Sequence, residues 1–275
     1  MYKGLNPRLW IAAIVLLAAS GCATAPVDTR GLETTPEQPG SVSGVAPAQT
    51  SPSHEVSAGK IKPSPKDFST RRRVITEREV RKLANKDPDL EFYRCIEILC
   101  RLNRKDKEYI RADMKHKRPL TVPVSFSSYK EWSPLPANVA GAGKIPKLIL
   151  VVKDIHFLGW YQNGRRVGDT YVCIGKMDGW TKKGMYRVQG KDPQHMSTYP
   201  NAYGEAALMP DALHIYERVW IHAGDVTGPN CSHGCINVPI DYSDKLYDWA
   251  EVGTSVLISG SLKDLGRDIK GSTKQ

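Results

Sequence analysis

The chain has 275 residues, of which 40% are hydrophobic and 25% are charged, and its formal net charge is +10 at pH 7. This length and apolar fraction exclude a chain without a core, because they are enough for one full core and a smaller element. The positive charge is concentrated, since residues 60–118 contain 19 Lys and Arg against 10 Asp and Glu.

The N-terminus has the pattern of a targeting segment. Two basic residues precede an apolar run at 9–19, which is too short to span a bilayer and ends in small residues. The run closes as Ala-Ser-Gly-Cys at 19–22, which resembles a bacterial lipobox with Ala where Leu is usual. We therefore expect a signal peptide over 1–21 and lipid on Cys22, the alternative being an ordinary signal peptide. Ala23 is not the aspartate associated with inner-membrane retention, so the resemblance implies an outer-membrane lipoprotein that faces the periplasm.

A low-complexity segment follows the cysteine. Residues 22–68 are dominated by Pro, Ser, Thr, Ala and Gly, with few large apolar side chains. Such a stretch buries too little surface to offset its ordering entropy, so the sequence predicts a disordered tether. Extended in a polyproline-like way, it would reach on the order of 100 Å.

Residues 69–140 are expected to form a small basic helical subdomain. Thr76 has capping-box spacing to Glu79, and Pro88 ends the first helical pattern before a second amphipathic segment begins. The stretch that ends at Pro123 weakly resembles the second half of a LysM-type peptidoglycan-binding module, but no opening strand is evident. The alternative is a helical subdomain that packs on the catalytic domain. Its basic residues are either a solvated face or a surface for an anionic wall polymer or lipid headgroups, whereas nucleic acid is a poor partner for an exported protein.

From residue 145 to 260 the pattern changes to short strands with regular turn signals. Asn163-Gly164 predicts a hairpin, and one helix is expected between a cap at Asp241 and a stop at Gly253. This pattern predicts a mainly β sandwich or barrel with one or two short helices, and a flexible tail over 261–275. The expected strands cover 147–152, 155–161, 167–174, 186–188, 213–216, 219–222 and 254–259.

One short motif carries the chemistry. Cys235 ends the sequence Cys-Ser-His-Gly-Cys at 231–235, and His222 ends an apolar strand upstream. A thiol becomes a good nucleophile when a neighbouring imidazole takes its proton, so Cys235 and His222 are the predicted nucleophile and base. The turn at His233-Gly234-Cys235 can direct successive backbone N–H groups at an oxyanion, and the glycine permits close approach of substrate. Ser232, directly before this turn, is a further candidate for oxyanion or substrate binding.

The stretch from Lys147 to Ser259 resembles the L,D-transpeptidase catalytic domain, which remodels bacterial peptidoglycan. The resemblance rests on His222-Ala-Gly followed by Ser-His-Gly-Cys-Ile-Asn at 232–237, with further matches at 172–175, 181–186, 209–213 and 253–256. Lys182 replaces a usual proline, and Asn237 stands where many members have arginine, although Asn also occurs there.

The resemblance implies a specific activity. Cys235 would form a thioester with the third stem-peptide residue and transfer it to an amine of another stem or of a protein. It also implies that a backbone carbonyl near Ala223 orients His222, that Asn237 and its neighbours contact substrate, and that no cofactor is needed. The partners would be peptidoglycan stem peptides, with a lipid anchor at Cys22.

Other functions remain open at this point. Water could accept the acyl group, which would make the protein a peptidoglycan carboxypeptidase or hydrolase, or the chain could be a non-catalytic tether that binds the wall. A zinc site built from His222, Cys231, His233 and Cys235 is a further alternative, but alternation along a short strand hinders convergence on one ion. The sequence therefore favours no metal.

An exported chain meets an oxidising compartment, so its other cysteines need partners or burial. Cys95, Cys100, Cys173 and Cys231 allow three pairings, and spacing alone does not choose between them. Resembling sequences have a small residue where Cys231 stands, and a free thiol there could trap Cys235. We therefore expect a Cys173–Cys231 disulfide, which requires Cα atoms within about 7 Å.

Overall fold

The computed structural model describes residues 68–200 and 204–272. The expected signal peptide, the lipidation site Cys22 and the tether up to residue 67 lie outside the described residues. No helix in the described part of the chain is long and apolar enough to cross a membrane. The N-terminal part of the prediction therefore stays a prediction.

The N-terminal part of the described chain is helical, with one strand before its three helices and one strand after them. Its elements are β1 (Thr70–Arg73), α1 (Glu77–Ala84), α2 (Phe92–Asn103), α3 (Lys107–Lys115) and β2 (Leu120–Pro123). The Thr76 hydroxyl accepts a hydrogen bond from the Glu79 N–H at 3.2 Å, which confirms the predicted cap. Strand β1 pairs antiparallel with β2. This opening strand was not evident because Thr-Arg-Arg-Arg has no apolar alternation, and pairing alone makes it extended.

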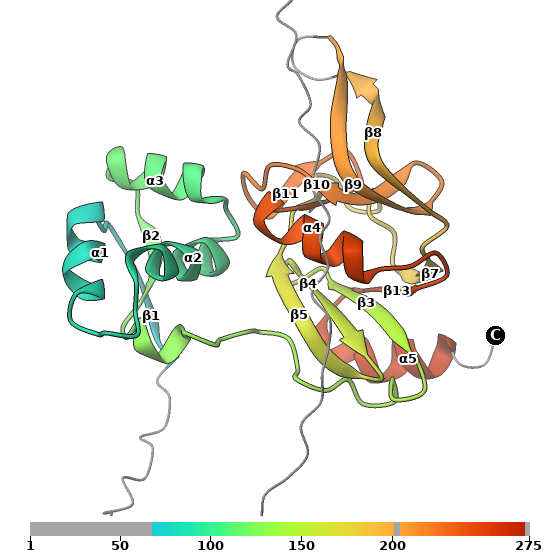
Figure 1. Cartoon of the computed structure of the whole chain (residues 1–275), viewed down its shortest axis with the longest axis horizontal. Coiled ribbons are helices and arrows are strands. Elements are labelled where there is room, and N and C mark those ends of the chain that lie inside the picture. Colours follow the sequence, from blue (N-terminus) through green and yellow to red (C-terminus); the bar gives the residue numbers. More distant parts are fainter. Residues whose placement is uncertain (1–67, 201–203, 273–275) are drawn as a thin grey trace, which may run out of the picture. The chain divides into compact units, whose positions relative to one another are not determined.

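The rest of the described chain is mainly β, as predicted (Figure 1). One sheet has the strand order β5-β4-β3-β13-β7, a second has β12-β10-β9-β8, and a third pairs β11 with β6. The elements are η1 (Ser127–Tyr129), β3 (Lys147–Val152), β4 (Phe157–Gln162), β5 (Arg165–Tyr171), β6 (Ile174–Gly175), β7 (Gly184–Arg187), β8 (Gly190–Pro200), β9 (Ala206–Tyr216), β10 (Val219–Ala223), β11 (Asn230–Ser232), β12 (Ile236–Val238), α4 (Ile240–Trp249), β13 (Ser255–Ser259), η2 (Leu262–Asp264) and α5 (Leu265–Ser272).

Strand β3 lies at the centre of the fold and is buried on both faces. Ile149 and Val151 belong to a core that includes Leu213, Ile221 and Ile236 of the four-stranded sheet, so these two sheets pack face to face. Alternate residues of the same strand, Leu148, Leu150 and Val152, belong to a second core. Burial on both faces explains why the strand is a continuous apolar run instead of an alternating one.

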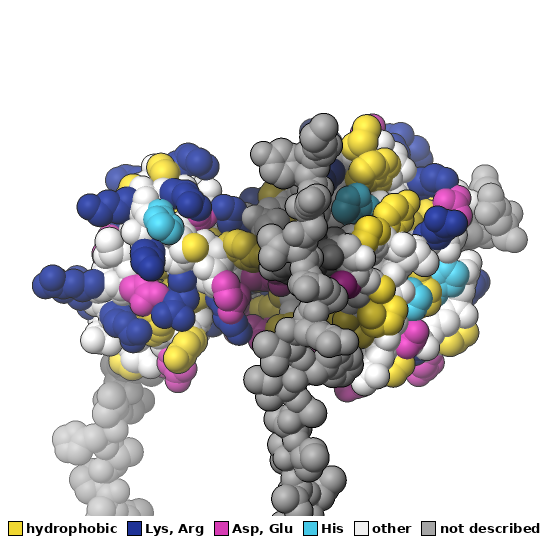
Figure 2. Space-filling view, turned by 90° about the horizontal axis from the view of Figure 1, so that it is seen from above, with side chains coloured by type: hydrophobic (Ala, Val, Ile, Leu, Met, Phe, Trp, Pro, Cys, Tyr) yellow, Lys and Arg dark blue, Asp and Glu magenta, His cyan; other side chains and the backbone are white. Residues whose placement is uncertain are grey.

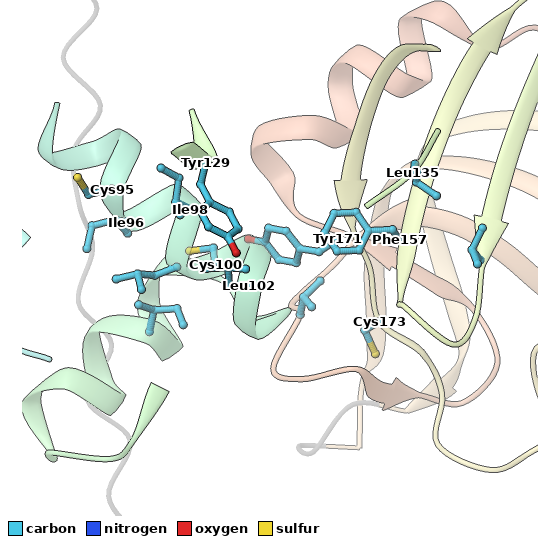
Figure 3. Close-up of a cluster of buried hydrophobic side chains, with 14 of the residues drawn as sticks. Cys95, Ile96, Ile98, Cys100, Leu102, Tyr129, Leu135, Phe157, Tyr171 and Cys173 are labelled. Carbon is cyan, nitrogen blue, oxygen red and sulfur yellow. The ribbon is translucent and has the colours of Figure 1, made fainter. Parts of the chain in front are cut away.

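The second core joins the helical part to the five-stranded sheet (Figure 3). Tyr171 and Phe157 of the five-stranded sheet lie in one buried cluster with Cys100 and Leu102 of α2. The residues from 69 to 140 therefore pack on the catalytic domain through a common apolar core.

A buried ion pair crosses the same boundary. Arg101 of α2 donates to the carboxylate of Asp169 on β5 at 2.7 Å, and both side chains are largely buried. The guanidinium also donates to the carbonyl oxygens of Trp132 and Asp169. Because a buried charge without a partner is costly, this pair fixes how α2 meets the sheet.

Two expectations about local structure are wrong. The expected flexible tail over 261–275 is a helix in its described part, because Leu265 and Ile269 of α5 are buried in the second core. Helix α4 begins at Ile240 after Pro239 and ends before Gly253, so neither Asp241 nor Gly253 has its expected role. The expected strand at 213–216 is confirmed as the end of a longer strand, β9, which forms a hairpin with β8.

The basic residues gather on the surface of the helical part, where Lys and Arg outnumber acidic side chains (Figure 2). The Lys and Arg that are exposed there are Arg71, Arg72, Arg78, Arg81, Lys82, Lys86, Lys107, Arg111, Lys115, Lys117 and Arg118. These side chains form an exposed basic face, and both the solvated face and the surface for an anionic partner stay predictions.

Candidate active site

Strand pairing brings His222 next to the segment that begins directly after Cys235. Strands β10 and β12 are parallel, and Ile221 pairs with Ile236 while His222 pairs with Asn237. Both isoleucines are buried between the sheets. Because neighbouring side chains in a strand point to opposite faces, His222 and Asn237 point away from that core. Cys235 directly precedes Ile236, the first residue of β12.

The Cys235 thiol lies beside the turn that leads into β10. Its sulfur is 3.6 Å from the carbonyl oxygen of Arg218, to which the thiol donates. Burial raises the pKa of the Cys235 thiol, and a hydrogen bond from the Trp220 N–H lowers it by a smaller amount. The described residues include no hydrogen bond between Cys235 and His222, a contact that in substrate-free sites often forms only when substrate binds. The raised pKa and the donation to the Arg218 carbonyl both favour the neutral thiol.

His222 is held in one tautomer. Its Nδ1 lies 2.7 Å from the carbonyl oxygen of Ala223, so Nδ1 carries the proton and donates it there. This is the hydrogen bond that the family resemblance implied. Burial lowers the pKa of His222, so the imidazole is neutral and its Nε2 can accept a proton.

The turn before Cys235 is stabilised by Ser232. The Ser232 hydroxyl accepts a hydrogen bond from the Gly234 N–H at 3.1 Å and donates to the Cys235 carbonyl oxygen at 2.5 Å. The Gly234 N–H is therefore used within the turn and is not free for an oxyanion. By contrast, the N–H groups of His233 and Cys235 have no hydrogen-bond partner among the described residues. These two groups are the available donors.

Thr181 is a residue of the site that the sequence did not single out. It is buried, its hydroxyl donates to the Gly234 carbonyl oxygen at 2.8 Å, and it accepts from the Gly175 N–H at 3.0 Å. The C=O and N–H of a trans peptide point in opposite directions. Fixing the Gly234 carbonyl therefore also fixes the direction of the Cys235 N–H. The signal was present, because Thr181 opens one of the motif segments that match the family.

Gly234 itself has a conformation that other residues rarely adopt. Its φ is +131°, and a Cβ at this position would lie 3.0 Å from the carbonyl oxygen of Trp180. The glycine is thus required both by the backbone angle and by the close approach of a neighbouring segment.

The predicted disulfide is confirmed. Cys173 and Cys231 are bonded, with Cα atoms 5.6 Å apart, and the described free cysteines are Cys95, Cys100 and Cys235. The bond removes Cys231 as a thiol neighbour of Cys235. It also removes Cys231 as a thiolate ligand, so the zinc alternative loses one member of its ligand set.

Asn237 positions the loop between the two catalytic strands. Its amide nitrogen donates to the carbonyl oxygen of Asp225 at 3.0 Å, and its backbone pairs with Cys173 in both directions. Asn237 therefore has a hydrogen-bonded place in the site, although arginine is frequent there in the family.

A cleft of about 2010 Å³ opens above these groups and is lined by both Cys235 and His222. One wall is the β8–β9 hairpin. Tyr199 of this hairpin stacks on His233 with ring centroids 5.6 Å apart, and His233 stacks on Trp180 at 5.7 Å. These aromatic contacts bring the hairpin to the turn that precedes the thiol. Sequence reasoning missed Tyr199 and Trp180, because a single aromatic residue outside a motif carries no signal of its own.

Comparisons with known proteins relate part of the chain to one family. The YkuD family model, described as the L,D-transpeptidase catalytic domain, matches residues 146–258. An L,D-transpeptidase from Mycobacterium smegmatis is 21% identical over 42% of this chain and 59% of that chain, with a TM-score of 0.38. One from Stackebrandtia nassauensis is 18% identical over 71% of this chain and 96% of that chain, with a TM-score of 0.44.

The catalytic domain of the E. faecium L,D-transpeptidase, solved by NMR as its ertapenem-acylated form, is 27% identical. The match covers 41% of this chain and 96% of the E. faecium domain, with a TM-score of 0.35. The chain spans about three fifths of the length of the mycobacterial structures that it matches. A search of curated proteins gives no match.

Proposed function

We propose that this chain forms a thioester on Cys235 and transfers the acyl group to an amine, because residues 146–258 match the family model of the L,D-transpeptidase catalytic domain. The observation that supports the proposal is that Cys235 and His222 line the same cleft, next to the paired strands β10 and β12. The acyl donor is a peptidoglycan stem peptide, and the bond that breaks follows its third residue.

In the first half-reaction Cys235 is acylated. His222 Nε2 takes the thiol proton, and the sulfur attacks the carbonyl carbon of the third stem residue. The C–N bond to the terminal D-residue then breaks, and His222 returns the proton to the departing amine. The Ala223 carbonyl stabilises the imidazolium in between, in the place that a carboxylate has in other triads.

The negative charge on the tetrahedral oxygen needs hydrogen-bond donors. The N–H groups of His233 and Cys235 suit this role, since they are unpaired among the described residues. Thr181 supports it by fixing the Gly234–Cys235 peptide. Donors that are already oriented cost no reorganisation when the charge develops.

In the second half-reaction an amine attacks the thioester. The new C–N bond forms as the C–S bond breaks, and the sulfur leaves as a thiolate that regains its proton through His222. No cofactor takes part in either step. The acceptor is the side-chain amine of another stem or an amine of a protein.

We also propose where the reaction takes place. The apolar run at 9–19 and Cys22 support a lipoprotein that is anchored in the outer membrane and faces the periplasm. The tether over 22–68 supports reach from that anchor towards the wall.

The test uses the purified full chain and purified sacculi, with mass analysis of the released and retained peptides. New cross-links are expected, and both Cys235→Ser and His222→Gln should abolish them while the far-ultraviolet circular dichroism is unchanged. Shortened stems without cross-links would identify a carboxypeptidase. Binding without any new product would identify a wall-binding tether, and activity retained by Cys235→Ser would overturn the thioester.

A further inference from the structure

A second imidazole in the cleft has no role in the steps above. His195 of β8 lines the cleft that holds Cys235 and His222. Its ring stacks on the Trp220 ring, with centroids 3.9 Å apart and planes 25° from parallel. Trp220 gives its backbone N–H to Cys235 and stands two residues before His222. His195 therefore contacts β10, the strand of His222, through the Trp220 ring.

The tautomer of His195 is set by a carboxylate. Asp192 Oδ2 lies 3.1 Å from Nδ1 of His195, and the His195 side chain is 22% exposed. With Nδ1 donating to Asp192, Nε2 has a lone pair, and no described residue donates to it. A carboxylate that accepts from one ring nitrogen leaves the other nitrogen as the proton acceptor, which is the arrangement of a catalytic dyad.

The neighbouring His214 differs in this respect. It also packs on Trp220, with centroids 4.5 Å apart, but its Nε2 is 2.9 Å from the Glu217 carbonyl oxygen. It has no carboxylate partner among the described residues. His214 and His195 therefore share the same aromatic contact, and of the two only His195 has a carboxylate partner among the described residues.

The chemistry of the second half-reaction requires a proton acceptor besides His222. An alkyl ammonium near neutral pH has to lose two protons to become a neutral amide nitrogen, because its pKa is about 10.4. The departing Cys235 sulfur takes back one of them through His222. The other must go to a different base before the nitrogen lone pair can attack.

We propose that His195, oriented by Asp192, accepts the first proton of the acceptor amine and releases it to solvent. The free amine then attacks the thioester carbon, the C–N bond forms, the C–S bond breaks, and the second proton passes through His222 to the sulfur. This role rests on the proposed transpeptidase function. It makes His195 a determinant of transfer to amines as opposed to water, since water attacks without first losing a proton from an ammonium.

The titratable groups around His195 are compatible with this role. They are Asp192 on β8, His214 on β9 and His222 on β10. Burial lowers the pKa of His222, and the charge of a protonated His195 lowers it further. A proton on one imidazole thus disfavours a proton on the other, which keeps His222 neutral while His195 carries the proton of the amine.

The experiment separates the two half-reactions in the full chain. The donor is a synthetic stem tetrapeptide that ends in a D-residue, and the acceptor is Nα-acetyl-lysine amide. Intact mass measures formation of the Cys235 thioester in a single turnover, and peptide mass analysis measures the ratio of amide to free tripeptide. The variants are His195→Gln and His195→Phe, with His214→Gln and His214→Phe as matched controls.

For both His195 variants we expect thioester formation within about threefold of wild type, and an amide-to-acid ratio at neutral pH that falls tenfold or more, because a general base contributes about 10²–10⁴ in rate. The ratio should recover as the pH approaches about 10, where the amine is deprotonated without help. Both His214 variants should keep the wild-type ratio.

Two results would overturn the assignment. An unchanged amide-to-acid ratio in His195→Gln would show that no base is needed there. A wild-type ratio in His195→Phe would show that His195 contributes only its stacking on Trp220. If the wild-type chain forms no thioester at all, the proposed function itself fails. If it forms the thioester and only the ratio is insensitive, the function stands and the role of His195 falls.

Discussion

Asp106 and Val226 bind each other twice. The Asp106 N–H donates to the Val226 carbonyl oxygen at 2.9 Å, and the Val226 N–H donates to the Asp106 carboxylate at 2.7 Å. Asp106 precedes α3 in the helical part, whereas Val226 lies in the loop between His222 and Cys235. The Tyr171 hydroxyl donates to the same carboxylate at 3.1 Å. The helical part therefore holds the loop that connects the two catalytic strands.

Removing this carboxylate should weaken both stability and catalysis. Asp106→Ala leaves the Val226 N–H and the Tyr171 hydroxyl without their acceptor, and each buried unpaired group costs about 1–3 kcal/mol. We expect lower free energy of unfolding in urea and slower thioester formation. Glu108→Ala, at an exposed position of α3 two residues after Asp106, is the control. Equal stability and rate in the two variants would show that the helical part does not support the loop.

The pH dependence of Cys235 alkylation should reveal a neutral resting pair. Burial raises the pKa of the thiol and lowers that of His222, so neither shift favours a thiolate–imidazolium pair. The rate with iodoacetamide should rise about tenfold per pH unit from neutral pH up to the raised thiol pKa. A plateau between about pH 5 and 8 would indicate the ion pair instead.

Two controls sharpen this measurement. His222→Gln should keep the alkylation profile, because a neutral imidazole does not stabilise the thiolate, yet it should lose acyl transfer. Cys235→Ser gives the background from the buried thiols. Burial raises the pKa of Cys95 to about 11, so its contribution near neutral pH is small.

Much of the site could be predicted from the sequence because its motif is local. Ser232 to Cys235 forms one turn. His222 lies on β10, which pairs with β12, the strand directly after that turn. The hydrogen bond from His222 to Ala223 is likewise a contact between chain neighbours. The central strand Lys147–Val152 has its predicted bounds, since burial on both faces gives it an uninterrupted apolar run.

What escaped prediction depends on contacts between distant residues. Strand β8 contains Pro193 and mostly polar residues, so it has no apolar alternation and is extended only because it pairs with β9. His195 consequently had no expected element and no expected neighbour. Asp106 had no signal either, because its partner lies 120 positions away. Tertiary pairing overrides local propensity in such segments.

The disulfide should protect the nucleophile as well as the fold. Cys173→Ser alone leaves a free Cys231 four residues before Cys235, so we expect activity that is lost in air and restored by a thiol reductant. The double variant Cys173→Ser with Cys231→Ser should be active without reductant. It should lose at most about 4 kcal/mol of unfolding free energy, given the separation of 58 residues. A single variant that is fully active after air oxidation would contradict the protective role.

Membrane attachment can be tested at Cys22, which lies outside the described residues. The lipobox resemblance predicts that Cys22→Ala moves the protein from the membrane fraction to the soluble periplasmic fraction. Labelling with a fatty-acid analogue should mark the wild type and not the variant. A membrane-bound Cys22→Ala would point to the exposed basic residues of the helical part as the anchor, and high salt should then release the protein.

Thr181 provides the sharpest test of how the turn is oriented. Thr181→Val keeps the shape of the side chain but removes the bonds to the Gly234 carbonyl and the Gly175 N–H. The Cys235 N–H then loses its fixed direction, and loss of one oxyanion donor lowers the rate by about 10²–10³. Thr181→Ser, which keeps the hydroxyl, should restore most of the rate. The acylation rate is measured in a single turnover, and stability is measured by urea unfolding. A purely structural defect in Thr181→Val would lower the midpoint of unfolding without the selective loss of acylation rate. Acylation by Thr181→Val at the wild-type rate would mean that the Gly234–Cys235 peptide is held by the rest of the turn.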